Sequence, residues 1–321
     1  MRHFGPRAPG TCEASISETS HSVPVSSMNS RAGRGGSVDR RIGTSRSRIT
    51  VRTGAKSAPP YEWEAMLRYL APRCTPGVEV VSGLSYSRTF GRGWFVVTNL
   101  EVVLTPNRDS VLARIRRLFD VDTDLSPIHQ ALSTDPLLAP LIRRRPGLRV
   151  AGAMDRFELA LRAVLGQQVS VVAASTFSGR LAAMLGEPVR DAPAGLTRLN
   201  VKAEHVAASR PSKIARIGLT RARAETVVAL AKAVVAGLVL RDDRDPEAQI
   251  VELRTVKGIG DWTASYIAMR ALHWPDAFPH GDLGLRKAAG GLTAKELLAV
   301  AERWRPYRAY AAMHLWASLH A

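Results

Sequence analysis

The chain has 321 residues, 45% of them hydrophobic, and its 45 lysines and arginines outnumber its 28 aspartates and glutamates, for a formal net charge of +17. This size allows two compact domains with buried cores, and the charge favours a polyanionic partner, nucleic acid before an acidic membrane surface, over a merely basic soluble protein. The sequence has no run of about 18 apolar residues that could span a membrane, and its two cysteines, Cys12 and Cys74, are too few for a disulfide framework or a four-thiolate iron–sulfur or zinc site.

Residues 1–47 are rich in serine, glycine and arginine and show neither a helical nor a strand period. We therefore expect a disordered basic tail. The segment lacks an apolar stretch of the length that a secretory signal needs. Three alternatives stay open: a transit peptide, a tail that binds DNA weakly, and translation from a later start at Met28.

Residues 48–150 are expected to form a small α+β domain. The alternation of apolar and polar residues in Ile49–Thr53 suits a strand, and Pro59-Pro60 precede a helical pattern over 61–70. Short β-rich runs separated by glycine and asparagine turns predict strands at 78–81, 86–90, 94–97 and 100–104. Helical spacing over 110–119 completes the domain.

Residues 151–321 are expected to form an all-α domain, so the fold class is α+β with the sheet first and the helices after it. Apolar residues recur at helical spacing over 157–165, 171–185, 225–238, 250–256, 262–272, 297–304 and 307–319. Neither an internal repeat nor a phosphate-cradling P-loop is visible in the sequence.

Gly258-Ile259-Gly260 lies between two of these helices. Glycine has no Cβ, so two glycines around one apolar residue allow a tight hairpin. The second helix then begins with free N–H groups that suit a phosphate oxygen. The alternative is an ordinary corner between two helices with a glycine stop.

Several motifs, taken in order, carry a resemblance to a known family: Pro59–Trp63, Arg145–Arg149, Leu165–Ser170, Val256–Ala264, Gly281-Asp282 and Glu302–Tyr310. Over roughly residues 48–321 the chain resembles the helix-hairpin-helix DNA glycosylase superfamily, and within it the DNA-3-methyladenine glycosylase II branch. The resemblance implies an N-terminal domain of a sheet with helices on one face and no catalytic group.

Asp282 matches the catalytic aspartate of this family by its position beyond the hairpin. Removal of a base leaves a sugar that becomes cationic in the transition state, as in glycoside hydrolysis, where carboxylates serve it. A fixed negative charge near that sugar favours the transition state over the ground state, and it can also orient or deprotonate the attacking water. The alternative is that Asp282 only caps the short helix after it.

The resemblance also assigns a base pocket to Trp262, Tyr266 and Trp316. Trp262 and Tyr266 share a helix face because they are four residues apart, and electron-rich rings attract the positive charge of an alkylated purine by roughly 0.5–2 kcal/mol. Leu283 completes the expected wall, although some members of the family have an aromatic residue there. The alternative is that the three aromatic residues are ordinary core.

Further expectations follow from the resemblance. Gly258, Ile259 and Gly260 would bind a DNA phosphate, and Gln168 would fill the gap left by the flipped base, unless the Gln pair merely connects two helices. Relatives that also cut the strand have a lysine at the position of Trp262, and that lysine forms a Schiff base. We therefore expect no lyase activity here.

The sequence thus predicts a monofunctional DNA glycosylase that excises 3-methyladenine- and 7-methylguanine-type bases. The alternatives are a non-catalytic DNA-binding or damage-sensing protein and a glycosylase for another lesion. The expected partner is double-stranded DNA with alkylated bases, and we expect no association with a membrane. We expect a monomer in a bacterial cytoplasm, associated with the nucleoid, with no cofactor or metal apart from a monovalent cation at the hairpin backbone.

Overall fold

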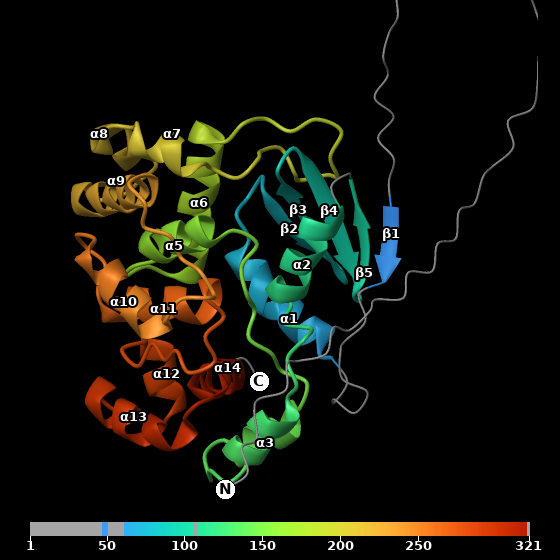
Figure 1. The fold of residues 1–321 in the computed structure, drawn as a ribbon, viewed down its shortest axis with the longest axis vertical. Helices are drawn as coiled ribbons and strands as arrows, with labels where there is room; N and C mark the ends of the chain where they lie inside the picture. The colour runs from blue at the N-terminus through green and yellow to red at the C-terminus, as the bar shows by residue number, and fades with distance from the viewer. Residues whose placement is uncertain (1–46, 51–60, 106–107, 320–321) are drawn as a thin grey trace, which may run out of the picture. The chain divides into compact units, whose positions relative to one another are not determined.

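The computed structural model describes residues 47–50, 61–105 and 108–319, all within one compact unit, Thr44–Ala321. Almost all of the expected tail, residues 1–46, lies outside the described residues, as do Cys12 and Pro59-Pro60. The expected order of elements, a small sheet and then many helices, is confirmed (Figure 1).

The sheet is antiparallel, with strand order β1-β5-β4-β3-β2. Its strands are β1 (Ser47–Thr50), β2 (Glu79–Ser82), β3 (Ser85–Phe90), β4 (Gly93–Thr98) and β5 (Glu101–Leu104). Tyr86 on β3 pairs with Val97 on β4, and Val97 pairs with Val102 on β5. All three side chains are buried, so this face of the sheet is the one that carries a core.

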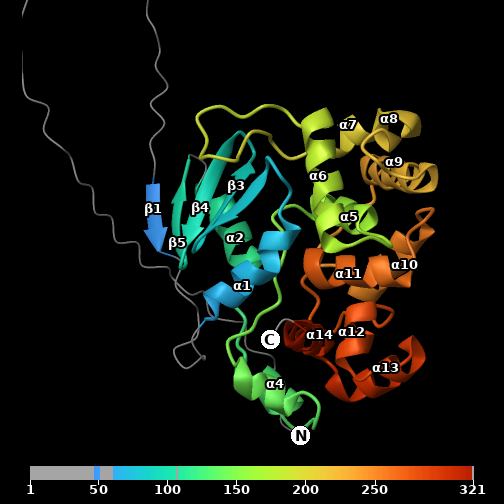
Figure 2. The same ribbon diagram turned by 180° about the vertical axis from the view of Figure 1, so that it is seen from behind.

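Two helices cover that face, α1 (Trp63–Leu70), which continues as a 3₁₀ turn over Ala71–Arg73, and α2 (Arg108–Leu118). Trp63 of α1 packs on Phe119 with ring centroids 4.9 Å apart, and Phe119 meets the ring edge of Tyr86. In both views α1 and α2 stand between the sheet and the helical part (Figures 1 and 2). Helix α1 can therefore contribute side chains to both.

The helical part contains more helices than its apolar periodicity indicated. Its helices are α3 (Ser126–Leu132), α4 (Ala139–Arg144), α5 (Arg156–Leu165), α6 (Val171–Leu185), α7 (Ala203–Ala207), α8 (Pro211–Ala215), α9 (Arg221–Val235), α10 (Pro246–Thr255), α11 (Asp261–Ala271), α12 (Leu283–Ala288), α13 (Ala294–Ala301) and α14 (Arg308–Ser318), with a 3₁₀ turn at Glu302–Trp304. Helices α3, α4, α7 and α8 were not anticipated, because five to seven residues are too few to show a helical period.

One large apolar core joins these helices, with α5 packed against both α9 and α11. Leu132 of α3 and Ile142 of α4 are buried in the same core. By sequence both residues fall within the segment 48–150 assigned to the N-terminal domain. Their side chains nevertheless lie among the helices rather than on the sheet.

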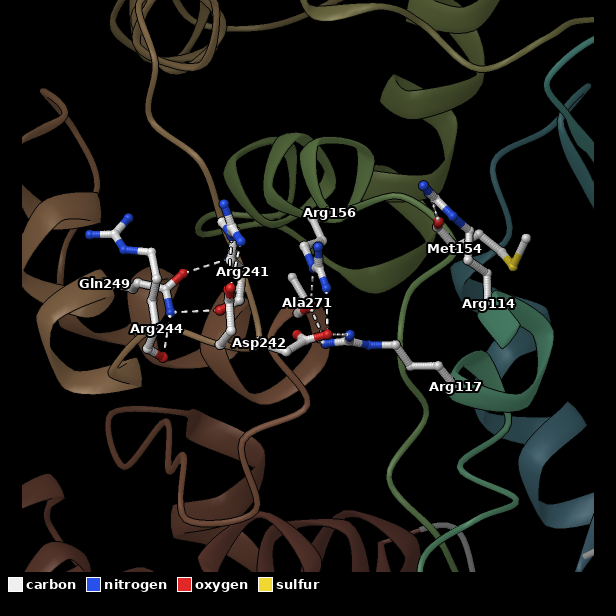
Figure 3. A network of polar contacts seen from close by, with 10 residues as sticks. Arg114, Arg117, Met154, Arg156, Arg241, Asp242, Arg244, Gln249 and Ala271 are labelled. Carbon is white, nitrogen blue, oxygen red and sulfur yellow. Dashed lines mark hydrogen bonds and ion pairs between the residues drawn. The ribbon is translucent and has the colours of Figure 1, made fainter. Parts of the chain in front are cut away.

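A polar brace ties the sheet side to the helical side, away from the hairpin (Figure 3). Arg117 of α2 and Arg156 of α5 both pair with Asp242, and both donate to the carbonyl oxygen of Ala271. Arg156 is at the start of α5 and Ala271 at the end of α11. The brace therefore fixes these ends, while the other ends of the same helices carry the site.

Candidate active site

The hairpin is held close to α9 by a glycine that no other residue can replace without strain. Gly258 has φ +87, and a Cβ at this position would lie 2.0 Å from Oγ1 of Thr226. Ile259 and Val256 anchor the turn because their side chains are buried. Ile259 can therefore offer a ligand only its backbone.

Helix α11 begins directly after the hairpin, with Gly260 as its N-cap. The first N–H groups of an α-helix have no partner within the helix, so they can meet an anion here. Asp261 in the first turn forms an ion pair with Arg254 at 2.9 Å. This pairing offsets the negative charge that would otherwise repel a phosphate.

Asp282 lies in a network of three donors. Its Oδ1 accepts from the backbone N–H of Leu285 at 3.0 Å and from Nε1 of Trp316 at 2.9 Å. Its Oδ2 accepts from Nε1 of Trp262 at 3.1 Å. Asp282 thus caps α12 and also touches two aromatic side chains, so the two interpretations of this residue are compatible. The carboxyl group is partly exposed rather than sealed in the core.

The three aromatic residues expected in a base pocket lie together beside this carboxylate. Trp262 stacks on Tyr266 with centroids 5.5 Å apart and an interplanar angle of 8°. Tyr266 meets the edge of Trp316 at 6.3 Å, and Tyr69 of α1 approaches Trp316 at 6.4 Å. We call Trp262, Tyr266, Trp316 and Tyr69 the ring cluster. Leu283 is 76% exposed, so it lies in solvent at the edge of the site.

Arg270 lies behind the ring cluster. Its Nη1 donates to the hydroxyl oxygens of Tyr266 at 2.9 Å and of Tyr69 at 3.2 Å. Burial alone would raise the pKa of Tyr266, but the charges of Arg270 and then Arg73 outweigh burial and lower that pKa to about 7. Tyr69 and Arg270 were missed in the sequence. Arg270 could have been found from the sequence, since it follows Tyr266 by one helical turn. Tyr69 could not, because only the fold brings it next to Tyr266.

The loop between α5 and α6 is attached to the hairpin. Gln168 is exposed and has φ +54, in the left-handed region. The neighbouring Gln167 donates through Nε2 to the carbonyl oxygen of Gly258 at 2.8 Å and to Oγ1 of Thr263 at 2.9 Å. Arg223 of α9 donates to the Gln167 carbonyl. The sequence drew attention to Gln168, but Gln167 is the residue that fixes the loop.

A partly open cavity lies next to Arg270 and is lined by charged side chains, among them the half-buried Arg73 and Arg162 and the buried Glu158. It does not include Asp282. Among residues 47–50, 61–105 and 108–319, no group of three or more His, Cys, Asp or Glu side chains is placed to hold a metal ion. No helix within those ranges is long and apolar enough to cross a membrane.

The chain is similar to known proteins in both sequence and structure. A family model described as the AlkA N-terminal domain matches residues 56–155. The chain is 35% identical to the DNA-3-methyladenine glycosylase 2 of Escherichia coli over 273 residues, which cover 80% of this chain and 94% of that protein.

A second relative is longer than this chain. The "Probable bifunctional transcriptional activator/DNA repair enzyme AlkA" of Mycobacterium tuberculosis is 39% identical over 297 residues, 86% of this chain, and the match covers 58% of that relative's length. The chain therefore spans little more than half of it. Among solved structures, the 3-methyladenine DNA-glycosylase from Archaeoglobus fulgidus superposes with a TM-score of 0.69 at 23% identity, over 84% of this chain and 97% of that one, which supports the fold.

Proposed function

Because this chain belongs to the DNA-3-methyladenine glycosylase 2 (AlkA) family, we propose that it excises alkylated bases from double-stranded DNA by hydrolysing the N-glycosidic bond, without cutting the strand. The substrates are bases of the 3-methyladenine and 7-methylguanine type. The observation that supports this proposal best is the pair of hydrogen bonds from Trp262 and Trp316 to Asp282. They hold a carboxylate at the mouth of an aromatic cluster.

The target base must first leave the duplex, which costs a few kcal/mol. The N–H groups at the start of α11, with Gly258, Ile259 and Gly260, hold a phosphate of the damaged strand. Gln168, exposed on the loop that Gln167 ties to the hairpin, enters the gap in the stack. Hydrogen bonds to the unpaired opposite base then offset part of the cost.

The flipped base enters the ring cluster, where a positively charged purine is attracted by the faces of Trp262, Tyr266 and Trp316. As the bond to C1′ breaks, positive charge develops on the sugar. Asp282 stabilises that charge, and its orientation is fixed in advance by three donors, so little reorganisation is needed at the moment of reaction. Water attacks C1′ and leaves an abasic site. Leu283 contacts the DNA at the rim.

Lyase chemistry would need an amine that attacks C1′ and forms a Schiff base. Trp262 occupies the position where such an amine would stand, and its indole N–H is bound to Asp282. Lys257 precedes the hairpin glycines in the sequence. Its side chain is exposed and pairs with Glu225 at 3.3 Å. The chain therefore uses water as its nucleophile.

Backbone carbonyls of the hairpin suit a monovalent cation, since neutral oxygen ligands favour ions of low charge. The oxygens of Val256 and Gly258 already accept from Ile259 and Gln167, and each carbonyl has a second lone pair. Such an ion would rigidify the turn. We further propose a monomer that acts on the nucleoid in a bacterial cytoplasm.

A panel of duplexes, each with one lesion, tests the proposal. Wild type should release 3-methyladenine, and Asp282→Asn should lose release by at least about a hundredfold, the loss expected for one preorganised electrostatic group, while DNA affinity stays within a few fold. Release at the wild-type rate by Asp282→Asn would refute the mechanism. Borohydride trapping of the protein on DNA would refute the water-only reaction.

A further inference from the structure

Arg270 carries a buried charge without an acidic partner. Its side chain is 3% exposed and donates to the carbonyl oxygens of Ala151 and Gly152. In the part of the chain that the structure describes, no ion pair joins Arg270 to a carboxylate, and its strongest favourable charge interactions are with Tyr69 and Tyr266. Since a buried cation is costly unless a neighbour compensates it, these two phenols have that role.

The two hydroxyl groups form a compact unit with the guanidinium. Nη1 of Arg270 donates to both, and the oxygens of Tyr69 and Tyr266 lie 3.5 Å apart. A nearby positive charge favours loss of one phenolic proton, and the proton that remains can be donated from one oxygen to the other. The geometry therefore favours one negative charge shared by two phenols.

After Arg270, the charged groups that act most strongly on Tyr266 are also positive, while the acidic side chains of Glu79 and Glu158 line the cavity beside Arg270. The guanidinium of Arg73 lies 3.9 Å from the centroid of the Tyr69 ring, and Arg162 of α5 contributes as well. Asp282 is connected to the unit through two tryptophans, Trp262, which stacks on Tyr266, and Trp316, whose ring contacts Tyr266 and Tyr69. Burial raises the pKa of Tyr69, whereas that of Tyr266 is lowered to about 7 despite burial. The two phenols are thus unequal, and Tyr266 is the more acidic of the two.

We propose that Tyr69 and Tyr266, held by Arg270, form a charge sensor that selects positively charged bases for the pocket. This inference rests on the proposed function. When one phenol has released its proton to solvent, the ring cluster gains a negative charge next to the expected base position. A cationic base is then attracted. With both phenols protonated, the charges of Arg73 and Arg270 would repel the same base, while a neutral base responds little to either state.

A titration of the full chain without DNA tests the ionisation directly. Ultraviolet difference spectra distinguish tyrosinate from tyrosine, so wild type should show one tyrosinate forming between about pH 6 and 8 that is absent from Tyr266→Phe. Tyr69→Phe should move the midpoint upward, because it removes a hydrogen bond that lowers the pKa of Tyr266. Tyr61→Phe, whose hydroxyl donates to Phe119, is the control and should titrate like wild type. Identical curves for wild type and Tyr266→Phe would overturn the proposal.

Excision kinetics test the selection. We expect the ratio of kcat/KM for 3-methyladenine to that for neutral hypoxanthine to fall in wild type as the pH is lowered through about 7. In Tyr266→Phe the ratio should be about tenfold lower, a change of roughly 1.4 kcal/mol, and independent of pH. A ratio with the same pH profile in both proteins would refute the sensor. If wild type released neither base, the proposed function would fail, while the titration would still report on the phenols.

Discussion

The indole N–H of Trp316 donates to Oδ1 of Asp282 at 2.9 Å, and this contact joins the last helix of the chain to the start of α12. The same oxygen accepts the N–H of Leu285, so the carboxylate is held by backbone and side chain together. Trp316 therefore has two roles in the proposed mechanism. Its ring walls the base pocket, and its N–H orients the group that stabilises the sugar cation.

Trp316→Phe separates these roles because it keeps an aromatic ring and removes the donor. A hydrogen bond to a charged group contributes about 1.5–3 kcal/mol, so we expect kcat for 3-methyladenine release to fall by roughly 10- to 100-fold. The affinity for damaged DNA should change much less. Single-turnover kinetics and a binding titration measure the two effects. Trp274→Phe, at a partly buried tryptophan outside the site, is the control, and an equal loss there would assign the effect to packing.

Gln167→Ala should uncouple base flipping from DNA binding. The change removes two hydrogen bonds, to Gly258 and Thr263, each contributing about 0.5–1.5 kcal/mol, and frees the loop that carries Gln168. We expect weak binding to undamaged DNA to persist while the fluorescence change of a base analogue next to the lesion decreases. Thr263→Val removes one of the two bonds and should give a smaller decrease. A full flipping signal in Gln167→Ala would contradict the coupling.

The sequence predicted the order of elements and indicated most residues of the candidate site, because those features depend on local pattern and motif spacing. Glycines between two helical periods indicated the hairpin, and four-residue spacing placed Trp262 and Tyr266 on one face. Tyr69 could not be predicted in this way. Its role depends on α1 reaching the helical part from the sheet side, a long-range contact that leaves no local pattern.

The hairpin glycines should differ sharply in what they tolerate. Gly258→Ala places a Cβ 2.0 Å from Oγ1 of Thr226 at φ +87, so both a clash and backbone strain oppose folding. We expect the free energy of unfolding to drop by about 3 kcal/mol. At Gly260 the φ is −98 and a Cβ would meet nothing within 4 Å.

Gly260→Ala should therefore leave stability within about 1 kcal/mol of wild type and instead weaken binding to DNA, since the new methyl group faces the expected phosphate. Urea unfolding and a DNA-binding titration on both variants separate the two effects. Stability lost equally in the two variants would show that Gly258 is not special. Full DNA affinity in Gly260→Ala would argue against phosphate binding at this turn.

A buried acid between the sheet and α5 predicts how stability depends on pH. Arg88 of β3 donates to Glu158 at 2.6 Å and to Glu79 at 3.1 Å, so one cation serves two carboxylates. Burial raises the pKa of Glu158 from 4.5 to about 7, against the pull of Arg88. Because the folded state then binds a proton more tightly than the unfolded chain, this group makes the protein less stable as the pH rises from about 4.5 to 7.

Glu158→Gln removes that titration and keeps a side chain of nearly the same shape. We expect the variant to lose less stability than wild type between these pH values, as measured by urea unfolding at several pH values. Glu64→Gln is the matched control, because the Glu64 side chain is exposed in the first turn of α1 and the substitution removes an acid that is not buried. If the stability of wild type and of Glu158→Gln depended on pH in the same way, Glu158 would be ionised over the whole pH range. Arg88 would then keep both carboxylates, Glu79 and Glu158, in their charged form.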